Sequence, residues 1–253
     1  MCRIPYWLVW LPLLAAAPSY AQSTAGDTSA HRMVLITASY AHQFPGGDLA
    51  DRFGHNSNLG LSVVRRTGSD WLLGVKGSFL FGNKVTEPGI IANVINSAGQ
   101  VVDQDGAMAD ILLFQRGWNS FLTVGRMFPT LRSKGRSGTT AELGVGYLRH
   151  KVRVQTQKNV VPQLEDDYLR GYDRLTAGPA ALLQLGYQYL SPRRRANFHV
   201  ALEFVAGFTE PLRAFNFDTE TYNRSGRLDI LTGLRIGWTL PIDRSEDERY
   251  FLY

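Results

Sequence analysis

The chain has 253 residues, of which 11% are aromatic and 19% charged, and it contains 25 glycines and one cysteine. This length predicts one domain, and a net charge of +5 scattered along the chain is too small to indicate a nucleic-acid-binding protein. The one cysteine, Cys2, lies in a segment that we expect to be removed, so the mature chain has no thiol for a disulfide bond or a metal site.

The first residues have the pattern of an export signal. Arg3 supplies a positive charge, and the apolar stretch 7–17 is too short to cross a bilayer as a helix. Ala21 is a suitable small residue for cleavage. We therefore predict a signal peptide over 1–21 and a flexible leader over 22–31. An uncleaved membrane anchor is the alternative, and the shortness of the apolar stretch argues against it.

Alternation of apolar and polar residues predicts eight β-strands in the rest of the chain. In chain order, these strands cover residues 33–42, 58–64, 71–82, 118–124, 141–147, 179–189, 197–209 and 228–240. The strands at 197–209 and 228–240 indicate most clearly the environment of each strand face. One face of each is apolar and aromatic, whereas the other carries small and polar residues with Glu203 or Arg235. Apolar residues outside and polar residues inside are typical of a transmembrane β-barrel, whereas a soluble sandwich has polar outward residues.

The connections between the predicted strands alternate in length. Short turns are predicted at 67–70, 129–139 and 191–195, and long loops at 44–56, after Gly82, at about 155–173 and before the last strand. Within the loop after Gly82, residues 89–106 are predicted to form a hairpin around Ser97, Ala98 and Gly99.

The predicted fold is an all-β transmembrane antiparallel up-and-down β-barrel of about eight strands, over residues 32–240. In such barrels the short turns are periplasmic and the long loops extracellular. An even number of strands then places both termini in the periplasm, including a C-terminal tail at 241–253. The expected location is the cell outer membrane.

The chain resembles small outer-membrane β-barrel proteins of Bacteroidota-type Gram-negative bacteria. The resemblance covers nearly the whole mature chain, and its most specific pieces are PGGDLADRFG, WLLGVKGSFLFGN, VPQLEDDYLRGYDRLTAGPA and GWTLPIDRSEDERYFLY. Those barrels are mostly of unassigned function, and the resemblance carries no catalytic residues over to this chain. Some small barrels of this kind are subunits of outer-membrane machines for barrel assembly or protein secretion, and the resemblance implies such a role here.

Four charged residues are predicted to face the lumen. Lys76, Glu203 and Arg235 are expected at similar depth, with Glu203 and Arg235 on adjacent strands and able to pair, and Glu142 is expected lower, toward periplasmic water. An ionised group in a narrow lumen is costly unless it is paired, so we interpret these residues as a structural charge network that plugs the barrel. The alternative is an ion or proton path, which the small interior of eight strands disfavours.

No strong catalytic or metal-binding pattern is present, and no cofactor is expected. His150 with the acidic run 165–167 comes nearest to the constellation of barrel hydrolases, but such acidic runs are usually solvated loops. Two pairs of acids without the spacing of a dedicated calcium loop are Asp48 with Asp51 and Asp218 with Glu220. We predict that the protein is not an enzyme.

Aromatic and arginine side chains in two loops are candidates for partner binding, because Tyr, Arg and Phe are enriched at interface centres. The candidates are Tyr168, Arg170 and Tyr172 in one loop and Arg213, Phe215 and Phe217 in the other. The alternative is that they form rim strands and aromatic anchors of the barrel.

The C-terminal residues Tyr250, Phe251 and Tyr253 follow Pro241 and a charged run, so we expect them to lie outside the last strand. Exposed aromatic side chains are costly in water. They are predicted to form a recognition peptide for the assembly machinery or a partner subunit. The alternative is that they fold back onto the barrel rim.

The functional prediction is an integral outer-membrane barrel that acts as a non-enzymatic accessory subunit of a larger complex for barrel assembly or protein secretion. Expected partners are outer-membrane lipid, lipopolysaccharide and other outer-membrane proteins, with no nucleic acid. A free-standing structural or small-solute barrel is the main alternative, and an outer-membrane hydrolase is a further one.

Overall fold

The computed structural model describes residues 32–87, 89–130, 136–157, 160–165, 168–191, 196–213, 215–218, 220–222 and 225–243. The predicted signal peptide, leader and C-terminal aromatic residues lie outside these ranges. Among the described residues, no helix is long and apolar enough to cross a membrane.

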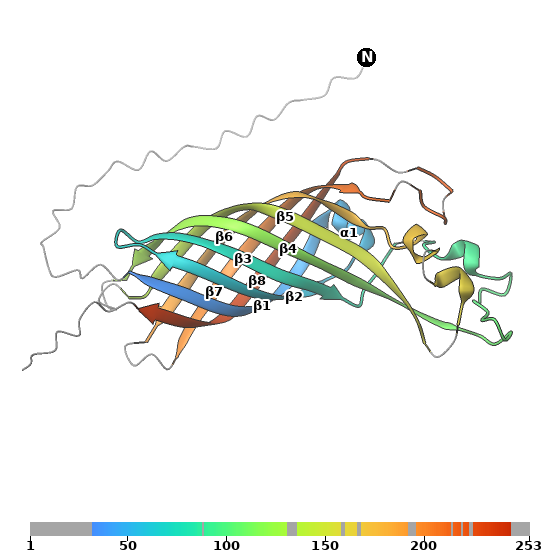
Figure 1. The fold of residues 1–253 in the computed structure, drawn as a ribbon, viewed down its shortest axis with the longest axis horizontal. Coiled ribbons are helices and arrows are strands. Elements are labelled where there is room, and N and C mark those ends of the chain that lie inside the picture. The colour runs from blue at the N-terminus through green and yellow to red at the C-terminus, as the bar shows by residue number, and fades with distance from the viewer. Residues whose placement is uncertain are drawn as a thin grey trace, which may run out of the picture.

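Eight antiparallel strands form a closed barrel in which each strand pairs with its neighbours in the chain and β8 pairs with β1 (Figure 1). The strands are β1 Met33–Gly47, β2 Asn56–Arg66, β3 Trp71–Gly82, β4 Asp110–Pro129, β5 Gly138–Gln157, β6 Thr176–Leu190, β7 Asn197–Pro211 and β8 Arg227–Asp243. The predicted all-β, up-and-down barrel of eight strands is confirmed.

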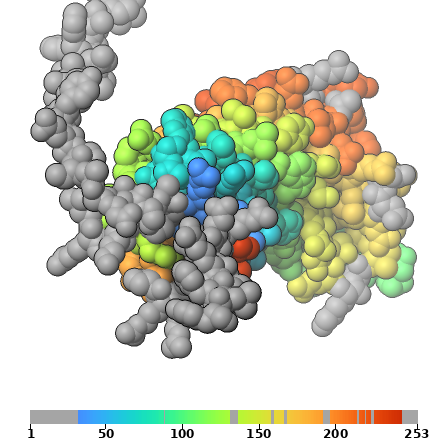
Figure 2. Space-filling view, turned by 60° about the vertical axis from the view of Figure 1, so that its left-hand side comes forward, coloured from blue at the N-terminus to red at the C-terminus, as the bar shows by residue number. Residues whose placement is uncertain are grey.

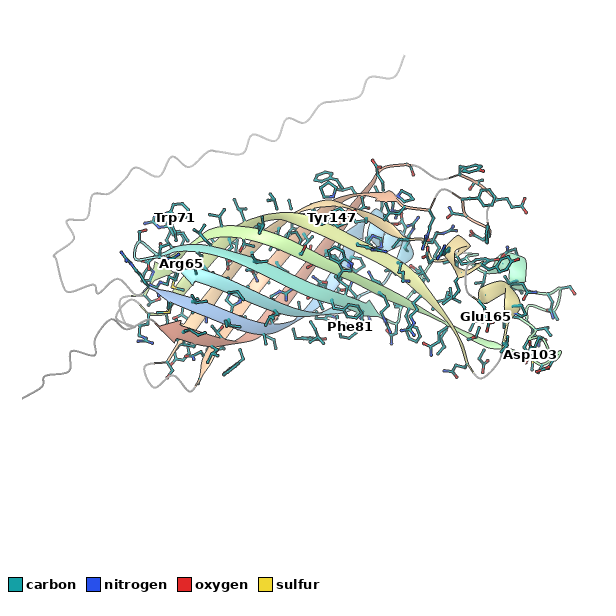
Figure 3. All side chains as sticks on the ribbon, viewed as in Figure 1. Arg65, Trp71, Phe81, Asp103, Tyr147 and Glu165 are labelled. Atoms are coloured by element: carbon teal, nitrogen blue, oxygen red, sulfur yellow. The ribbon has the colours of Figure 1, made fainter. Side chains whose placement is uncertain are left out.

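The two ends of the barrel differ as the loop lengths predict. Short connections follow β2, β4 and β6 at one end, which we call the turn end. Long connections follow β1, β3, β5 and β7 at the other, which we call the loop end. In Figure 3, Arg65 and Trp71 lie at the turn end, whereas Asp103 and Glu165 lie far out at the loop end.

The outer face of the barrel is a continuous apolar band. Along β3 the outward column runs from Trp71 through Leu73 and Val75 to Phe79 and Phe81. Trp71, Leu73, Val75 and Phe79 are each about half exposed. At about 3.3 Å per residue and a strand tilt of about 40°, this column is roughly 25 Å tall, the height of the apolar band of transmembrane barrels. The chain therefore spans a membrane with its strands.

The inner face carries the opposite residues of each strand. Along β7 the inward side chains include Asn197, His199, Glu203 and Thr209, all less than a tenth exposed, while their neighbours Phe198, Leu202 and Phe208 face outward. The alternation seen in the sequence at 197–209 and 228–240 thus assigns the two faces correctly, because side chains in a strand have a strict period of two.

Several element boundaries differ from the prediction at the loop end. β1 continues to Gly47, and the predicted polar loop at 44–56 instead contains the last residues of β1 and the short helix α1, Asp48–Arg52. β4 and β5 each have 20 residues. Their upper parts pair only with each other and form a two-stranded ribbon that projects beyond the barrel (Figure 1).

The hairpin predicted at 89–106 is wrong. This segment contains the 3₁₀ helix η1, Ala92–Val94, and a tight turn in which the Asn96 side chain accepts hydrogen bonds from the backbone N–H groups of Ala98 and Gln100. The one β-bridge here joins Val102 to Met108. Two β-prone runs outside the membrane have no third strand to pair with, and a lone hairpin is marginal in water.

Two further local patterns were misleading. The alternation in YLRGYDR indicated a rim strand as one alternative, but Tyr168–Gly171 is a 3₁₀ helix, η4. Pro241 was expected to lie beyond the last strand, but β8 continues through it to Asp243, with Pro241 opposite Leu35 of β1.

Candidate functional site

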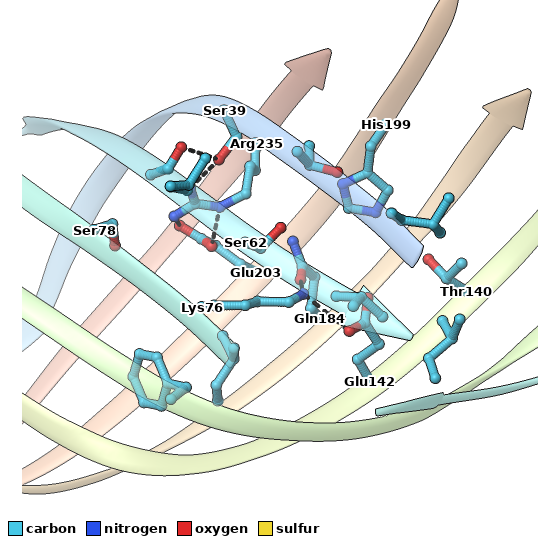
Figure 4. Close-up of a pocket in the computed structure, with 18 of the residues that line it drawn as sticks. Ser39, Ser62, Lys76, Ser78, Thr140, Glu142, Gln184, His199, Glu203 and Arg235 are labelled. Atoms are coloured by element: carbon cyan, nitrogen blue, oxygen red, sulfur yellow. Dashed lines mark hydrogen bonds and ion pairs between the residues drawn. The ribbon is translucent and has the colours of Figure 1, made fainter. Parts of the chain in front are cut away.

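The half of the lumen nearer the turn end holds a cluster of four charged side chains and one glutamine, which we call the lumen cluster: Lys76, Glu142, Gln184, Glu203 and Arg235 (Figure 4). Arg235 on β8 donates from Nε to Glu203 Oε2 at 2.7 Å and from Nη2 to Glu203 Oε1 at 3.0 Å. Such a two-pronged pair between an arginine and a carboxylate is strong and fixes the geometry of both groups.

Arg235 makes two further hydrogen bonds. Nη1 donates to Ser39 Oγ at 2.8 Å, and Nη2 donates to Asn58 Oδ1 at 3.0 Å. Gln43 Nε2 adds a further hydrogen bond to Glu203 Oε1 at 2.7 Å. The Glu203–Arg235 unit therefore links β7 and β8 to β1 and β2, and a buried pair with this many partners is a structural joint.

Lys76 forms the second pair of the cluster. Its Nζ lies 3.0 Å from Glu142 Oε2 and also donates to Gln184. Glu142 is only 5% exposed, so the expectation that it faces periplasmic water is wrong. This pairing could not be predicted from sequence position, because β3 and β5 are not adjacent and the long Lys76 side chain reaches across β4.

Gly60 on β2, two strands away from β8, makes room for the Arg235 side chain. A Cβ at Gly60 would lie 2.7 Å from Arg235 Nη1 and 3.0 Å from Ser39 Oγ. The free space left among these side chains is a cavity of about 50 Å³. That volume corresponds to a few water molecules.

Between the lumen cluster and the loop end lie buried apolar side chains and a buried histidine–aspartate pair. Leu49 and Phe53, from α1 and the residue after it, are both 1% exposed and belong to the same apolar core as Leu148. His150 Nε2 lies 2.8 Å from Asp229 Oδ2, and Phe53 packs edge-on against its ring.

This geometry does not bring His150 to the acidic loop as the hydrolase alternative required. Its partner is Asp229 on β8, and both side chains are at most 1% exposed. Asp166 and Asp167 lie outside the described residues, and Glu165 lies far out in the loop region (Figure 3). A catalytic histidine has to reach its substrate, and this one is covered by Phe53.

One charged side chain from each of the four long loops meets at the loop end. We call this set the loop network: Arg52, Glu87, Arg174 and Asp218. Glu87 lies 2.8 Å from Arg52 Nε and 3.3 Å from Arg174 Nε, and Arg174 also pairs with Asp218. All four side chains are 15% exposed or less.

The environment of the loop network keeps its charges paired. Burial lowers the pKa of Arg52 below its ordinary value, while the charge of Glu87 acts in the opposite direction. Arginine nevertheless stays protonated in proteins, so Arg52 keeps its positive charge. Figure 2 shows the β5–β6 and β7–β8 loops side by side, and Phe217 N donates to Gly171 O between them at 3.2 Å. The four loops thus form one platform.

The predicted partner-binding residues fall into two groups. Tyr172, Arg213 and Phe217 have partners inside the platform. Tyr172 OH accepts from Asn93 at 2.9 Å and its ring packs on Phe217, and Arg213 Nη2 lies 2.8 Å from Asp173 Oδ2. These contacts hold the loops together.

The other group faces outward. Tyr168 is 62% exposed, Arg170 is exposed, and Phe215 is partly exposed. Tyr222, which the sequence reasoning missed, is 73% exposed, and its ring centroid lies 5.1 Å from that of Phe215. The signal was present in the sequence as another loop aromatic, but without the fold nothing linked it to Phe215.

Two other expectations concern metal and the C-terminus. Across the part of the chain that is described, no group of three or more His, Cys, Asp or Glu side chains is placed to hold a metal ion. Tyr250, Phe251 and Tyr253 lie outside the described residues.

Comparison with known proteins yields structural likeness only. No family model matches the chain, and no curated protein matches it. Among solved structures, Neisserial surface protein A is 12% identical, with a TM-score of 0.41, over 82% of this chain and 96% of that one. Ail, the attachment invasion locus protein of Yersinia pestis, solved in complex with the heparin analogue sucrose octasulfate, is 12% identical, with a TM-score of 0.36, over 83% and 99%.

Proposed function

We propose that this chain is an integral outer-membrane barrel whose role is binding, as a non-enzymatic accessory subunit of a larger outer-membrane complex. The observation that carries the proposal is the loop network, which joins all four long loops into one platform above a filled lumen. A filled barrel is a membrane anchor, and ordered loops are what it presents to a partner.

The interior supports binding over transport. The charges of the lumen cluster are paired inside the barrel, and Leu49 and Phe53 are buried in the apolar core. A free-standing small-solute barrel remains the alternative, and planar-bilayer recording separates the two. The purified barrel should show no steady conductance, and stable large channels would favour the solute barrel.

The outward-facing loop residues supply the binding surface of the proposal. Tyr168 and Tyr222 are well exposed, and Phe215 packs edge-on against Tyr222, so aromatic area is displayed on ordered loops. Tyrosine and phenylalanine bury a large area at little conformational cost, which is why they are enriched at interface centres.

Co-purification tests the accessory role. The natively tagged protein, extracted in mild detergent, should retain a stoichiometric outer-membrane partner, and the double variant Tyr168→Ala with Tyr222→Ala should lose it. Ile95→Ala, an exposed apolar residue elsewhere in the loops, is the matched control and should keep the partner. Recovery of the barrel alone in every case would contradict the subunit proposal.

The C-terminal aromatic residues are part of the same proposal. Tyr250, Phe251 and Tyr253 are proposed to be recognised by the assembly machinery or by the partner. Deletion of residues 250–253 leaves β8 intact and should abolish insertion or partner recovery, while the isolated barrel still refolds in detergent. Unchanged insertion and recovery would overturn this role.

A further inference from the structure

Four basic side chains lie together on the outer face of the β4–β5 pair near the loop end. We call them the basic patch: Arg116, Arg149, Lys151 and Arg153. Arg116 is directly opposite Lys151, and Phe114 is opposite Arg153, in the ladder between the two strands. Side chains directly opposite each other in an antiparallel pair have Cβ atoms about 5 Å apart.

The basic patch lies immediately above the apolar band. Going up β5, the outward residues change from Val145 and Tyr147 to Arg149 and Lys151. On β4 the same change occurs between Trp118 and Arg116, and the Trp118 and Tyr147 rings are 5.9 Å apart. Aromatic residues mark the edge of the hydrocarbon in transmembrane barrels, so the next residues toward the loop end lie at the level of the lipid headgroups.

The patch lacks acidic partners. None of the four cations forms an ion pair with an acid in the described part of the chain. Placing Arg116 directly opposite Lys151 is unfavourable without a counter-charge. Elsewhere the described arginines Arg52, Arg174 and Arg235 are each matched by a carboxylate.

A recess in the surface accompanies the charges. It measures about 170 Å³ and is lined by Arg116, Arg149 and Lys151 together with Phe79 and Trp118. Arg116 is held in place, because its Nη1 donates to the backbone oxygen of Gln115 at 2.7 Å and its guanidinium lies 4.9 Å from the centroid of the Phe114 ring. The recess therefore offers positive charge above and aromatic surface below.

We propose that the basic patch binds phosphate groups on the headgroup of an anionic lipid in the leaflet at the loop end. Arginine recognises phosphate through paired N–H donors, and lysine adds a point charge. The acyl chains of the same lipid run down the apolar band beside Trp118 and Phe79. A molecule with phosphate above and hydrocarbon below matches the order of residues along both strands.

Native mass spectrometry of the full-length mature protein in detergent tests this proposal, with diphosphorylated lipid A as the probe. The triple variant Arg149→Gln, Lys151→Gln and Arg153→Gln should weaken lipid binding by at least about tenfold, since it removes three charge-assisted contacts. The matched control is Arg65→Gln with Arg126→Gln, which removes outward cations at the turn end, where Arg126 also lies over a phenylalanine ring. The control should change binding by less than about twofold.

Further probes separate the sources of the anion. Phosphatidylcholine should bind equally to all variants, and inorganic phosphate should neither bind tightly nor compete. Equal loss of lipid binding in the triple variant and the control would overturn a specific site, as would unchanged binding in the triple variant. Tight binding of inorganic phosphate or of a sulfated oligosaccharide without lipid binding would also overturn it. A heat-shifted gel band confirms that each variant is folded.

Discussion

Arg235 shows how a single side chain organises the lower lumen. It is paired with Glu203 and also donates to Ser39 and Asn58, so four strands meet at one guanidinium. Arg235→Ala leaves the Glu203 carboxylate buried without its cation and should lower the free energy of unfolding by about 3–5 kcal/mol. Denaturant titration of the refolded barrel in detergent measures this change.

A second variant tests whether the unpaired charge of Glu203 causes the loss of stability. Glu203→Gln in the Arg235→Ala background removes the unpaired charge and should recover part of the lost stability, since Gln43 still has an oxygen to bond. A double variant as unstable as the single one would mean that lost packing, and not the buried charge, causes the destabilisation.

Substitution of Gly60 should lower stability, because the added side chain would collide with Arg235. A Cβ there meets Arg235 Nη1 at 2.7 Å, so Gly60→Ala should cost about 1–3 kcal/mol of stability and less in the Arg235→Ala background. Gly77→Ala is the matched control, because a Cβ at Gly77 meets no atom within 4 Å and points toward lipid. Equal costs at the two glycines in denaturant titrations would contradict this account.

At the level of elements, the loop network connects the four long loops, which share no strand or helix. Glu87 is its centre, with Arg52 on one side and Arg174 on the other. Glu87→Ala leaves both arginines without this carboxylate, so the loops should open more often while the barrel stays folded. Limited proteolysis should then cleave the β3–β4 loop at least about fivefold faster, because cleavage follows the open population.

Asp105 provides the control for that experiment. It lies in the same loop and is exposed, so Asp105→Ala should leave the cleavage rate nearly unchanged. Faster cleavage in both variants would indicate that the β3–β4 loop is open regardless of the ion pairs.

The strands were predictable from sequence and the loop platform was not, for a physical reason. In a strand such as β7 the residue type alone indicates the face, because apolar Phe198 lies on the outer face and charged Glu203 on the inner face. The pairing of Glu203 with Arg235 followed from adjacency of their strands. Glu87 and Arg174 are 87 positions apart in the chain. The residues around each of them form no pattern that would indicate the other as its partner. Local alternation likewise misassigned Tyr168–Gly171, where tertiary contacts decide the backbone.

At the scale of the whole molecule, orientation in the membrane remains a prediction. Long loops outside and short turns in the periplasm require that a cysteine at Ser97 be labelled from outside intact cells, while one at Ser69 is labelled only after permeabilisation. Both positions are exposed, so accessibility to the reagent depends only on the side of the membrane. Asn223, another loop position suited to this test, lies outside the described residues.

A single-cysteine background makes the labelling clean, because the mature chain predicted to begin after Ala21 contains no cysteine. Labelling at Ser69 with none at Ser97 would invert the orientation. It would also place the basic patch in the opposite leaflet.

The seam between β1 and β8 has a consequence for how the chain folds. These strands pair over 15 residues, from Met33 opposite Asp243 to Gly47 opposite Asp229. Across the seam, the hydroxyl groups of Thr37 and Thr239 form a hydrogen bond between residues that are 202 positions apart in the chain. Contacts this distant in sequence form late, because the loop-closure entropy is overcome only when the intervening strands are ordered. The barrel therefore closes as its final folding event, after the last strand has been synthesised. Once closed, the barrel has no free strand edge, so unfolding requires two neighbouring strands to separate, and the barrier to that separation sets the lifetime of the folded state.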